Sequence, residues 1–194
     1  GEKFIENKNV ALILGDNFFY GQNLSTNLIN NSKLNTGAKI LLYKVLKPEL
    51  FGVAKINSKK KVVYIKEKPK KFISDFAITG LYFFDKNVIK YAKSLKPSKR
   101  KELEIVDLLN IYKSYNNLKA KLLNKNIEWL DAGSENSLLL ASNLVKKLEK
   151  KNIKIGYLEH ISYKNKWINK NKIRENIKFF GNCNYSNFLR KIIK

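Results

Sequence analysis

The sequence is poor in the residues on which several classes of protein depend. Its 194 residues contain one cysteine, Cys183, one histidine, three prolines and no methionine. A single cysteine excludes an internal disulfide and fits a reducing compartment. No window comes near the roughly eighteen consecutive apolar residues of a membrane span, and the N-terminus lacks the apolar centre of a signal peptide. We therefore expect no membrane segment, no export, and a cytoplasmic location.

Arginine is also scarce, although the chain is strongly basic. The formal net charge is +23, yet only three of the 39 basic residues are arginines and the rest are lysines. A nucleic-acid-binding protein more often uses arginine for bidentate contacts and clusters its charge with aromatic residues. Here the lysines are spread along the whole chain, as a biased codon usage would place them. A basic nucleic-acid-binding protein stays open as an alternative that only the bulk charge supports.

Apolar runs alternate with helical patterns over most of the chain. The run 10–14 stops at a Gly-Asp-Asn sequence, as a buried parallel strand does when it reaches a loop. A helix over 22–34 and a buried strand over 38–45 complete a β-α-β pattern. Gly80, inside another apolar run, indicates close approach of a neighbouring group. Further strands are expected at 52–56, 62–65, 77–84 and 118–123, and helices at 88–94, 102–115, 135–151, 170–179 and 185–193.

The composition changes near residue 150, where lysine, asparagine, tyrosine and isoleucine become dominant. We expect one α/β domain over residues 1–150 and a helical C-terminal region over 151–194. Segment 129–134 is expected to form a turn that opens the long helix 135–151.

Two aspartates stand where a metal ligand would be useful. Asp16 follows the first predicted strand, and Asp131 precedes the long helix. Ligands of open α/β sheets bind at the carboxyl ends of strands, and Mg²⁺ commonly takes one or two carboxylates from a protein. Turn and N-cap positions also favour aspartate. On the residues alone, the turn and capping roles are the commoner ones.

Three further residues could bind an anion or a sugar. Glu67 and Lys68 come directly after the strand 62–65 and Lys66, where a carboxylate can accept from hydroxyls and an ammonium can meet a phosphate. Arg100 lies in the loop before the helix 102–115, a position that suits an anion. In so lysine-rich a chain, a solvated charge pair and an exposed arginine are the commoner roles.

Other reactive residues lack partners in the sequence. His160 and Cys183 have no acid, base or nucleophile placed around them, so neither is predicted to be catalytic. Tyr82 and Phe83 are expected in the core. The chain contains no zinc-ligand spacing, no Walker loop and no GxSxG elbow.

Several motifs taken together resemble one family. They include the sequence Leu-Gly-Asp-Asn around Asp16, the Glu-Lys-Pro that begins at Glu67, and the Trp-Leu-Asp that ends at Asp131. In this order and spacing they resemble the glucose-1-phosphate thymidylyltransferases, over almost the whole chain. The motifs are, in chain order, Leu12–Gly21, Phe51–Val53, Glu67–Pro69, Ala77–Asp85, Lys96–Ser98, Arg100, Glu102–Ile105, Asp107, Trp129–Asp131 and Gly133.

The resemblance implies a fold and a reaction. The fold would be a Rossmann-like mixed sheet flanked by helices, with a helical C-terminal region. The reaction would be Mg²⁺-dependent transfer from dTTP to glucose 1-phosphate, giving dTDP-glucose and pyrophosphate as the first step toward dTDP-rhamnose and related deoxysugars. The family also implies a homo-oligomer, typically a tetramer. From the composition we expect no nucleic-acid and no membrane partner.

The same resemblance assigns residues. It implies Asp16 and Asp131 as the Mg²⁺ ligands, and it places five residues at the sugar nucleotide. These substrate-binding residues are Gly52, Glu67, Lys68, Ile78 and Arg100.

The sequence departs from the family pattern in several places. Lys66, Lys101 and Ala132 replace residues usual beside these motifs, and Ala132 removes a hydroxyl near the expected metal. The glycine-rich loop and first strands that bind the nucleotide triphosphate in the family do not occur in these 194 residues. We therefore expect an N-terminally truncated chain that is inactive by itself, with no certain catalytic residue. A non-catalytic remnant or regulatory sugar-nucleotide-binding module is the alternative.

Overall fold

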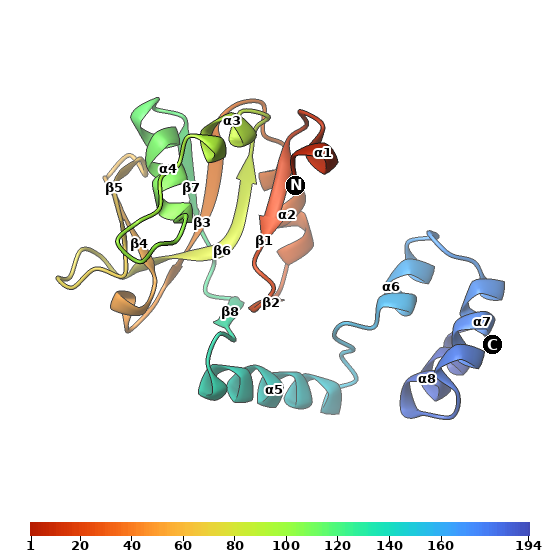
Figure 1. The fold of residues 1–194 in the computed structure, drawn as a ribbon. Helices are drawn as coiled ribbons and strands as arrows, with labels where there is room; N and C mark the ends of the chain where they lie inside the picture. The colour runs from red at the N-terminus through yellow and green to blue at the C-terminus, as the bar shows by residue number, and fades with distance from the viewer. The chain divides into compact units, whose positions relative to one another are not determined.

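A computed structural model describes all 194 residues, Gly1 to Lys194 (Figure 1). The chain divides into two units, Gly1–Ala141 and Ser142–Lys194. The first unit is a mixed α/β structure, as the sequence predicts. Its strands are β1 (Val10–Ile13), β2 (Asn17–Gly21), β3 (Ala38–Lys44), β4 (Gly52–Ile56), β5 (Val62–Glu67), β6 (Phe76–Phe84), β7 (Leu118–Leu122) and β8 (Ile127–Asp131).

The helices of the first unit are short and connect the strands. They are α1 (Glu2–Ile5), α2 (Leu24–Ser32), the 3₁₀ turn η1 (Pro48–Leu50), α3 (Val88–Lys93) and α4 (Ile105–Ser114), and α5 (Glu135–Lys150) begins in this unit. None of the helices is both long and apolar enough to cross a membrane.

Strand β6 organises the main sheet. Antiparallel β3 pairs with β6 on one side, and β7 then pairs parallel with β3. On the other side of β6, β1 pairs with Leu81–Phe84, whereas β4 meets β6 at Ala77 and carries β5 at the sheet edge. Residues 78–80 of β6 therefore lie between the places where β1 and β4 pair.

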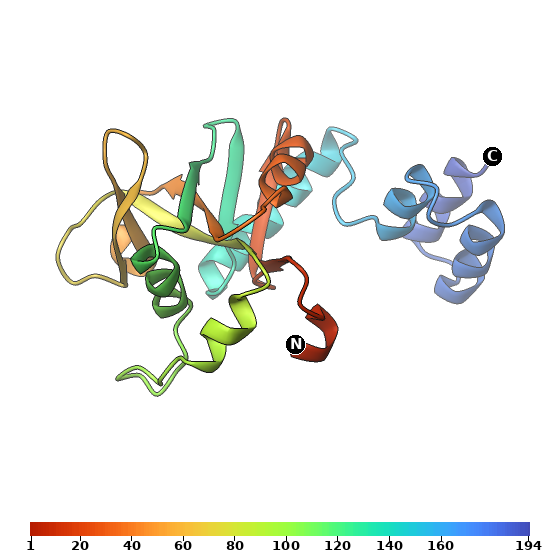
Figure 2. The same ribbon diagram turned by 90° about the horizontal axis from the view of Figure 1, so that it is seen from above.

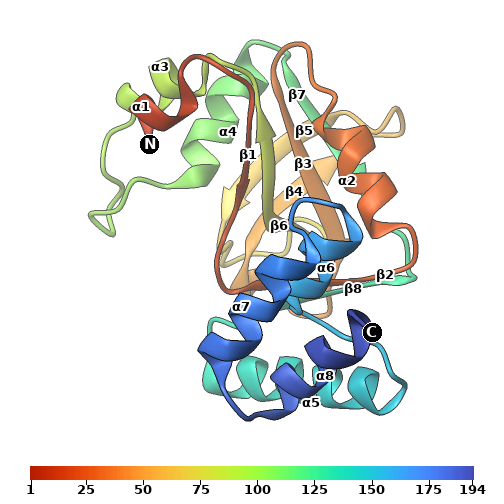
Figure 3. The ribbon, with the colours of Figure 1, turned by 90° about the vertical axis from the view of Figure 1, so that its right-hand side faces the viewer.

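Side chains alternate between the two faces of this sheet, as the period of a strand requires. Ile40 and Tyr82 lie in a core with α3 and α4, whereas Leu41 and Phe83 lie in a second core with α2. Figures 2 and 3 show α2 on one face of the sheet and α3 and α4 on the other. The central strands β3 and β6 are thus apolar on both faces, which explains their continuous apolar runs.

The prediction of a buried parallel strand at 10–14 was correct about the strand but wrong about its direction and its burial. Strand β1 forms there, but it is antiparallel to β6 and its residues are half-exposed or exposed. Leu12 is 40% exposed and Ile13 is 55% exposed. The physical reason is that β1 pairs only with β6, so its second edge and much of its surface have no neighbouring element.

The sequence also missed a two-stranded ribbon. Segment 129–134 was expected to be a turn, but residues up to Asp131 belong to β8, and β8 pairs antiparallel with β2. The register places Asn17 opposite Asp131 and Phe19 opposite Trp129. This ribbon brings two segments that are far apart in the sequence to the same place.

The second unit has a small core of its own. It contains α6 (Leu158–Lys164), α7 (Lys170–Phe180) and α8 (Asn184–Ile192), and its buried apolar residues are Ile173, Ile177 and Leu189. The Asn169 side chain caps α7 by accepting from the backbone N–H of Lys172 at 3.0 Å. The predicted helices 170–179 and 185–193 form. The predicted domain boundary at 150 coincides with the end of α5, whereas the two units divide within this helix.

Candidate functional site

A cavity opens where strands β1 and β4 leave β6. It has a volume of about 180 Å³, and Ile78 and Gly80 of β6 contribute to its wall. Four of the predicted substrate-binding residues and one predicted metal ligand line it. The lining is Leu14, Asn17, Leu50, Phe51, Gly52, Glu67, Lys68, Ile78, Gly80, Tyr82, Ile105, Val106, Trp129 and Asp131.

Glu67 is held at this cavity by the β4–β5 ladder. It pairs with Gly52, and a Cβ atom at position 52 would stand 3.0 Å from Glu67 Oε2 and 3.2 Å from a methyl group of Val106. The absence of a side chain at Gly52 therefore leaves the space that the carboxylate occupies. The methyl end of Ile78 lies 3.9 Å from the same point, so it supplies an apolar neighbour.

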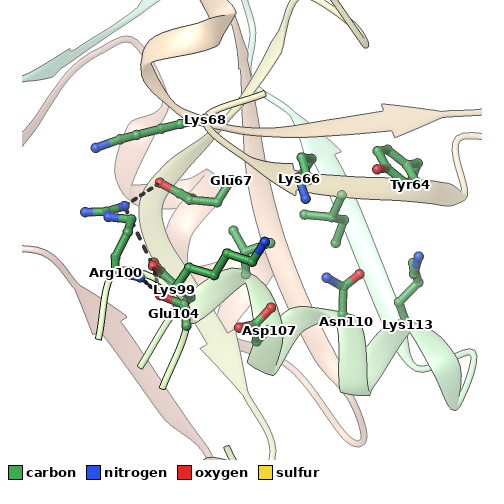
Figure 4. A pocket seen from close by; sticks show the side chains of 13 residues that line it. Tyr64, Lys66, Glu67, Lys68, Lys99, Arg100, Glu104, Asp107, Asn110 and Lys113 are labelled. Carbon is green, nitrogen blue, oxygen red and sulfur yellow. Dashed lines mark hydrogen bonds and ion pairs between the residues drawn. The ribbon is translucent and has the colours of Figure 1, made fainter. Parts of the chain in front are cut away.

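Arg100 lines a larger cleft, which shares Glu67, Lys68 and Val106 with this cavity (Figure 4). The cleft has a volume of about 820 Å³ and lies between β5 and α4. The guanidinium of Arg100 lies 4.0 Å from Glu67 Oε1, 3.7 Å from Glu104 Oε1 and 2.8 Å from Glu102 Oε2. Figure 4 shows Lys68 beside Arg100, so two cations stand close to the Glu67 carboxylate.

The surroundings of Glu67 change its acidity. Burial raises the pKa of this carboxyl, and repulsion from Glu104 and Asp107 raises it further, against the opposing attraction of Lys68 and Arg100. The net direction is upward, so the ionised form carries a cost in the folded protein. A carboxylate poorly satisfied by its own protein is suited to accept hydrogen bonds from a ligand.

The two predicted metal ligands converge on one point. A Cβ atom at Gly133 would lie 3.0 Å from Asp131 Oδ1 and 3.3 Å from Asp16 Oδ2. Asp131 ends β8, and Asp16 lies in the turn between β1 and β2, so the ribbon brings the two carboxylates together. A backbone hydrogen bond of 2.8 Å from Ala132 N–H to Asp16 C=O ties the two segments beside them.

This arrangement fits a hard divalent cation. Neither carboxylate forms an ion pair with a lysine or an arginine. No third His, Cys, Asp or Glu joins them, which matches the one or two protein carboxylates that Mg²⁺ commonly takes. Burial, together with the negative charges of Glu67, Asp131 and Asp16, raises the pKa of the Tyr82 hydroxyl. Tyr82 thus interacts electrostatically with all three carboxylates, which lie around one site.

Sequence reasoning missed two residues of the site. Asn17 and Trp129 line the cavity, and the Trp129 indole N–H donates to Asn17 Oδ1 at 2.6 Å. Gly80 also donates its backbone N–H to Asn17 Oδ1, at 2.9 Å. A Cβ at Gly80 would meet the Asn17 amide at 2.5 Å. The close approach expected at Gly80 is that of Asn17, and a glycine inside a strand was the available signal.

The lone histidine and cysteine have structural partners in the second unit. The His160 ring packs edge-on against Phe188, with centroids 5.2 Å apart. Cys183 is the N-cap of α8 and accepts from the backbone N–H of Ser186 at 3.4 Å. Neither belongs to a cluster of metal-ligating groups.

Comparison with known proteins places the chain in a family. Residues 1–148 match the family model described as nucleotidyl transferase. A glucose-1-phosphate thymidylyltransferase from Neisseria meningitidis is 40% identical over 195 residues, covering 100% of this chain and 68% of that protein. One from Mycolicibacterium smegmatis is 37% identical over 194 residues, covering 100% and 67%. The chain belongs to the glucose-1-phosphate thymidylyltransferase family of nucleotidyl transferases. The resemblance seen in the sequence is confirmed.

A solved structure extends the family likeness to the fold. A Bacillus anthracis protein, described as a glucose-1-phosphate thymidylyltransferase and solved in complex with sucrose, is 42% identical. Its structure matches with a TM-score of 0.63 over 74% of this chain and 56% of that chain. The nucleotidyltransferase fold, with a mixed sheet flanked by helices, is therefore confirmed. The chain spans about two thirds of the length of the curated thymidylyltransferases it matches, and just over half of this solved one.

Proposed function

We propose that the protein transfers a thymidylyl group from dTTP to glucose 1-phosphate and releases pyrophosphate, as the first step toward dTDP-deoxysugars. The observation that supports this function is the convergence of Gly52, Glu67, Lys68 and Ile78 on one cavity that Asp131 also lines, beside Asp16. These residues were assigned from separate motifs of the sequence. Their convergence is what a substrate site of this family requires.

The reaction is an in-line displacement. A phosphate oxygen of glucose 1-phosphate forms a bond to the α-phosphorus of dTTP, the bond from that phosphorus to the bridging oxygen breaks, and pyrophosphate carries away the electron pair. The chain's residues would act by positioning their substrate. Glu67 would accept from sugar hydroxyls, Lys68 and Arg100 would meet the sugar phosphate, and Gly52 would let the hexose approach the backbone.

Asp16 and Asp131 would hold Mg²⁺. When bound there, the ion would supply charge stabilisation for phosphate oxygens. The carboxylates would fix its position at the boundary between the ribbon and the cavity. Because Asp131 also lines the cavity, that stabilisation would be supplied beside the proposed substrate site.

We further propose that these 194 residues bind glucose 1-phosphate but do not turn over dTTP alone, because the triphosphate loop of the family does not occur in them. The direct tests are titration calorimetry with glucose 1-phosphate and a pyrophosphate-release assay with dTTP, glucose 1-phosphate and Mg²⁺. We expect saturable binding that Glu67→Gln weakens about tenfold, which corresponds to loss of one charged hydrogen bond.

The outcomes separate the alternatives. Folded chain that binds no glucose 1-phosphate at millimolar concentration would contradict the proposed site. Pyrophosphate release that Asp16→Asn abolishes would confirm the reaction and show that the chain needs no further segment. Binding of dTDP-glucose that is unchanged in Asp16→Asn and Asp131→Asn would favour a non-catalytic sugar-nucleotide-binding module.

A further inference from the structure

Both the oxygen and the nitrogen of the Asn17 side-chain amide form hydrogen bonds within the protein. Its Oδ1 accepts from the backbone N–H of Gly80 at 2.9 Å and from the indole N–H of Trp129 at 2.6 Å. Its Nδ2 donates to Oδ1 of Asp16 at 2.9 Å. The amide thus connects the central strand β6 and the ribbon strand β8 to one of the metal-binding carboxylates.

The chemistry of these partners fixes the orientation of the amide. A backbone N–H and an indole N–H can only donate, so the group that faces both must be the carbonyl oxygen of Asn17. The NH₂ group then points away from Gly80 and Trp129, toward Asp16. A flipped amide would oppose two donors with a third and would leave the carboxylate opposite an oxygen.

Asp16 depends on this amide more than Asp131 depends on any side chain. Asp131 ends a paired strand, and its Oδ1 accepts from the backbone N–H of Gly133 at 3.1 Å. Asp16 lies exposed in the turn after β1, and the bond from Asn17 is the only hydrogen bond that its carboxylate receives. That bond engages Oδ1 and leaves Oδ2 directed to the point that it shares with Asp131.

We propose that Asn17 is a positioning residue of the metal site, which orients the Asp16 carboxylate toward Asp131 and fixes that orientation to β6 through Gly80 and to the ribbon through Trp129. The inference rests on the proposed Mg²⁺ site. The inference adds Asn17 to that site as a residue that contacts the Asp16 carboxylate. Outer-shell groups of this kind typically change metal affinity about 10- to 100-fold when they are removed.

The first test is Mn²⁺ binding to the 194-residue chain, followed by the electron paramagnetic resonance of the free ion. We expect Asn17→Ala to weaken binding by about 10- to 100-fold. Asn27→Ala is the matched control, because the Asn27 amide donates only to the backbone carbonyl of Asn23, the N-cap of α2, at 3.0 Å. We expect its Mn²⁺ affinity to equal that of the unchanged chain.

A double-mutant cycle separates positioning from general damage. If Asn17 acts through Asp16, its removal has no further effect once Asp16 no longer ligates, so Asp16→Asn and Asp16→Asn with Asn17→Ala should bind Mn²⁺ equally. An equal loss in both backgrounds would overturn the proposal. Trp129→Phe is a milder second variant, because it removes one donor and keeps the Asn17 amide. We expect it to lower Mn²⁺ affinity less than Asn17→Ala does.

The two tryptophans allow Mg²⁺ binding to be followed by spectroscopy, with no assay of enzyme activity. Trp129 is 6% exposed and bonded to Asn17, whereas Trp167 is 73% exposed in the second unit. We expect Mg²⁺ to shift the Trp129 indole N–H resonance and to leave that of Trp167 unchanged, and Asn17→Ala to suppress the shift. If the unchanged chain and Asn17→Ala showed equal Mg²⁺ affinities and equal shifts, the positioning role of Asn17 would be overturned but the metal site would not. Binding unaffected by Asp16→Asn and Asp131→Asn would overturn the metal site itself.

Discussion

Gly52 and Glu67 form one pair of the β4–β5 ladder, and the carboxylate of Glu67 occupies the space beside Gly52 where any other residue has a side chain. The position of the Glu67 carboxylate therefore depends on glycine at residue 52. The same pattern recurs at Gly133 with the two aspartates and at Gly80 with Asn17. At three places in the site a glycine makes room for a polar side chain.

Gly52→Ala should weaken the binding of glucose 1-phosphate more than it affects folding. The new Cβ would stand 3.0 Å from Glu67 Oε2, which must then move, and 3.2 Å from Val106. We expect about a tenfold loss of affinity, or about 1.4 kcal/mol, in titration calorimetry. Gly15→Ala is the control, since nothing lies within 4 Å of its Cβ. Equal affinities of these two variants would contradict the dependence of Glu67 on Gly52.

Gly133→Ala should weaken metal binding without removing a ligand. Its Cβ would meet Asp131 Oδ1 at 3.0 Å and Asp16 Oδ2 at 3.3 Å, at the point where both oxygens converge. We expect Mn²⁺ affinity to fall about 10-fold or more, by analogy with displaced supporting groups. The measurement is a Mn²⁺ titration of Gly133→Ala beside Gly15→Ala, and an unchanged Gly133→Ala would place the metal elsewhere.

Glu67→Gln should stabilise the fold at neutral pH while it weakens sugar-phosphate binding. The folded-state pKa of Glu67 is raised, above all by burial. Its contribution to stability is therefore fully present below the unfolded pKa and is lost as the pH rises through the folded pKa. An uncharged amide avoids that loss.

The check is the urea midpoint of unfolding at several pH values. We expect Glu67→Gln to exceed the unchanged chain at pH 7 and the difference to shrink toward pH 4. Glu49→Gln, at an exposed glutamate without an ion pair, is the control and should show no such trend. A lower midpoint for Glu67→Gln at pH 7 would show that Lys68 and Arg100 outweigh burial.

Asp85→Asn should destabilise the first unit. The buried Asp85 carboxylate accepts from the Gly37 backbone N–H at 2.7 Å, from the Tyr112 hydroxyl at 2.9 Å, and from Asn87. Burial by itself would raise the pKa of this carboxyl, but these hydrogen bonds outweigh it and lower the pKa. We expect a loss of about 1–3 kcal/mol at pH 7, measured by urea unfolding.

The pH dependence of this effect has a definite sign. A lowered folded-state pKa gives stability that is present above the unfolded pKa and is lost as the pH falls through the folded pKa. The destabilisation by Asp85→Asn should therefore shrink in acid. Asp75→Asn, which removes a partly exposed pair with Lys44 at 2.9 Å, is the control and should change stability by less than about 1 kcal/mol. Equal effects of the two variants would contradict the assignment.

Periodicity predicted the strands better than it predicted their surroundings. The apolar residues of β1 were enough to place a strand, but burial depends on what pairs with its second edge, and nothing in the run from Leu12 to Leu14 encodes that. Strand β8 escaped notice because residues 129–131 were assigned to the turn before the helix 135–151, although Ile127 and Trp129 alternate with exposed Glu128 as a strand requires.

Which residues gather at the cavity was more predictable than how they are held there. Glu67, Lys68 and Gly52 were assigned from motifs, and the structure brings them to one cavity with Ile78 and Asp131. The role of Asn17 could not be predicted, because asparagine is ordinary in a turn and its two donors lie 63 and 112 residues away. Such partners become visible only when the ribbon and the central strand are placed in three dimensions.

The β2–β8 ribbon also bears on the order of folding. The bond from Trp129 to Asn17 closes a loop of 112 residues, whereas the β4–β5 hairpin forms between near neighbours. Long loops close at a greater entropic cost, so contacts of this separation tend to form late. The two aspartates would meet only when the first unit is almost complete. An ion bound between them would hold together the two ends of this unit, and its concentration would set how often that last contact opens.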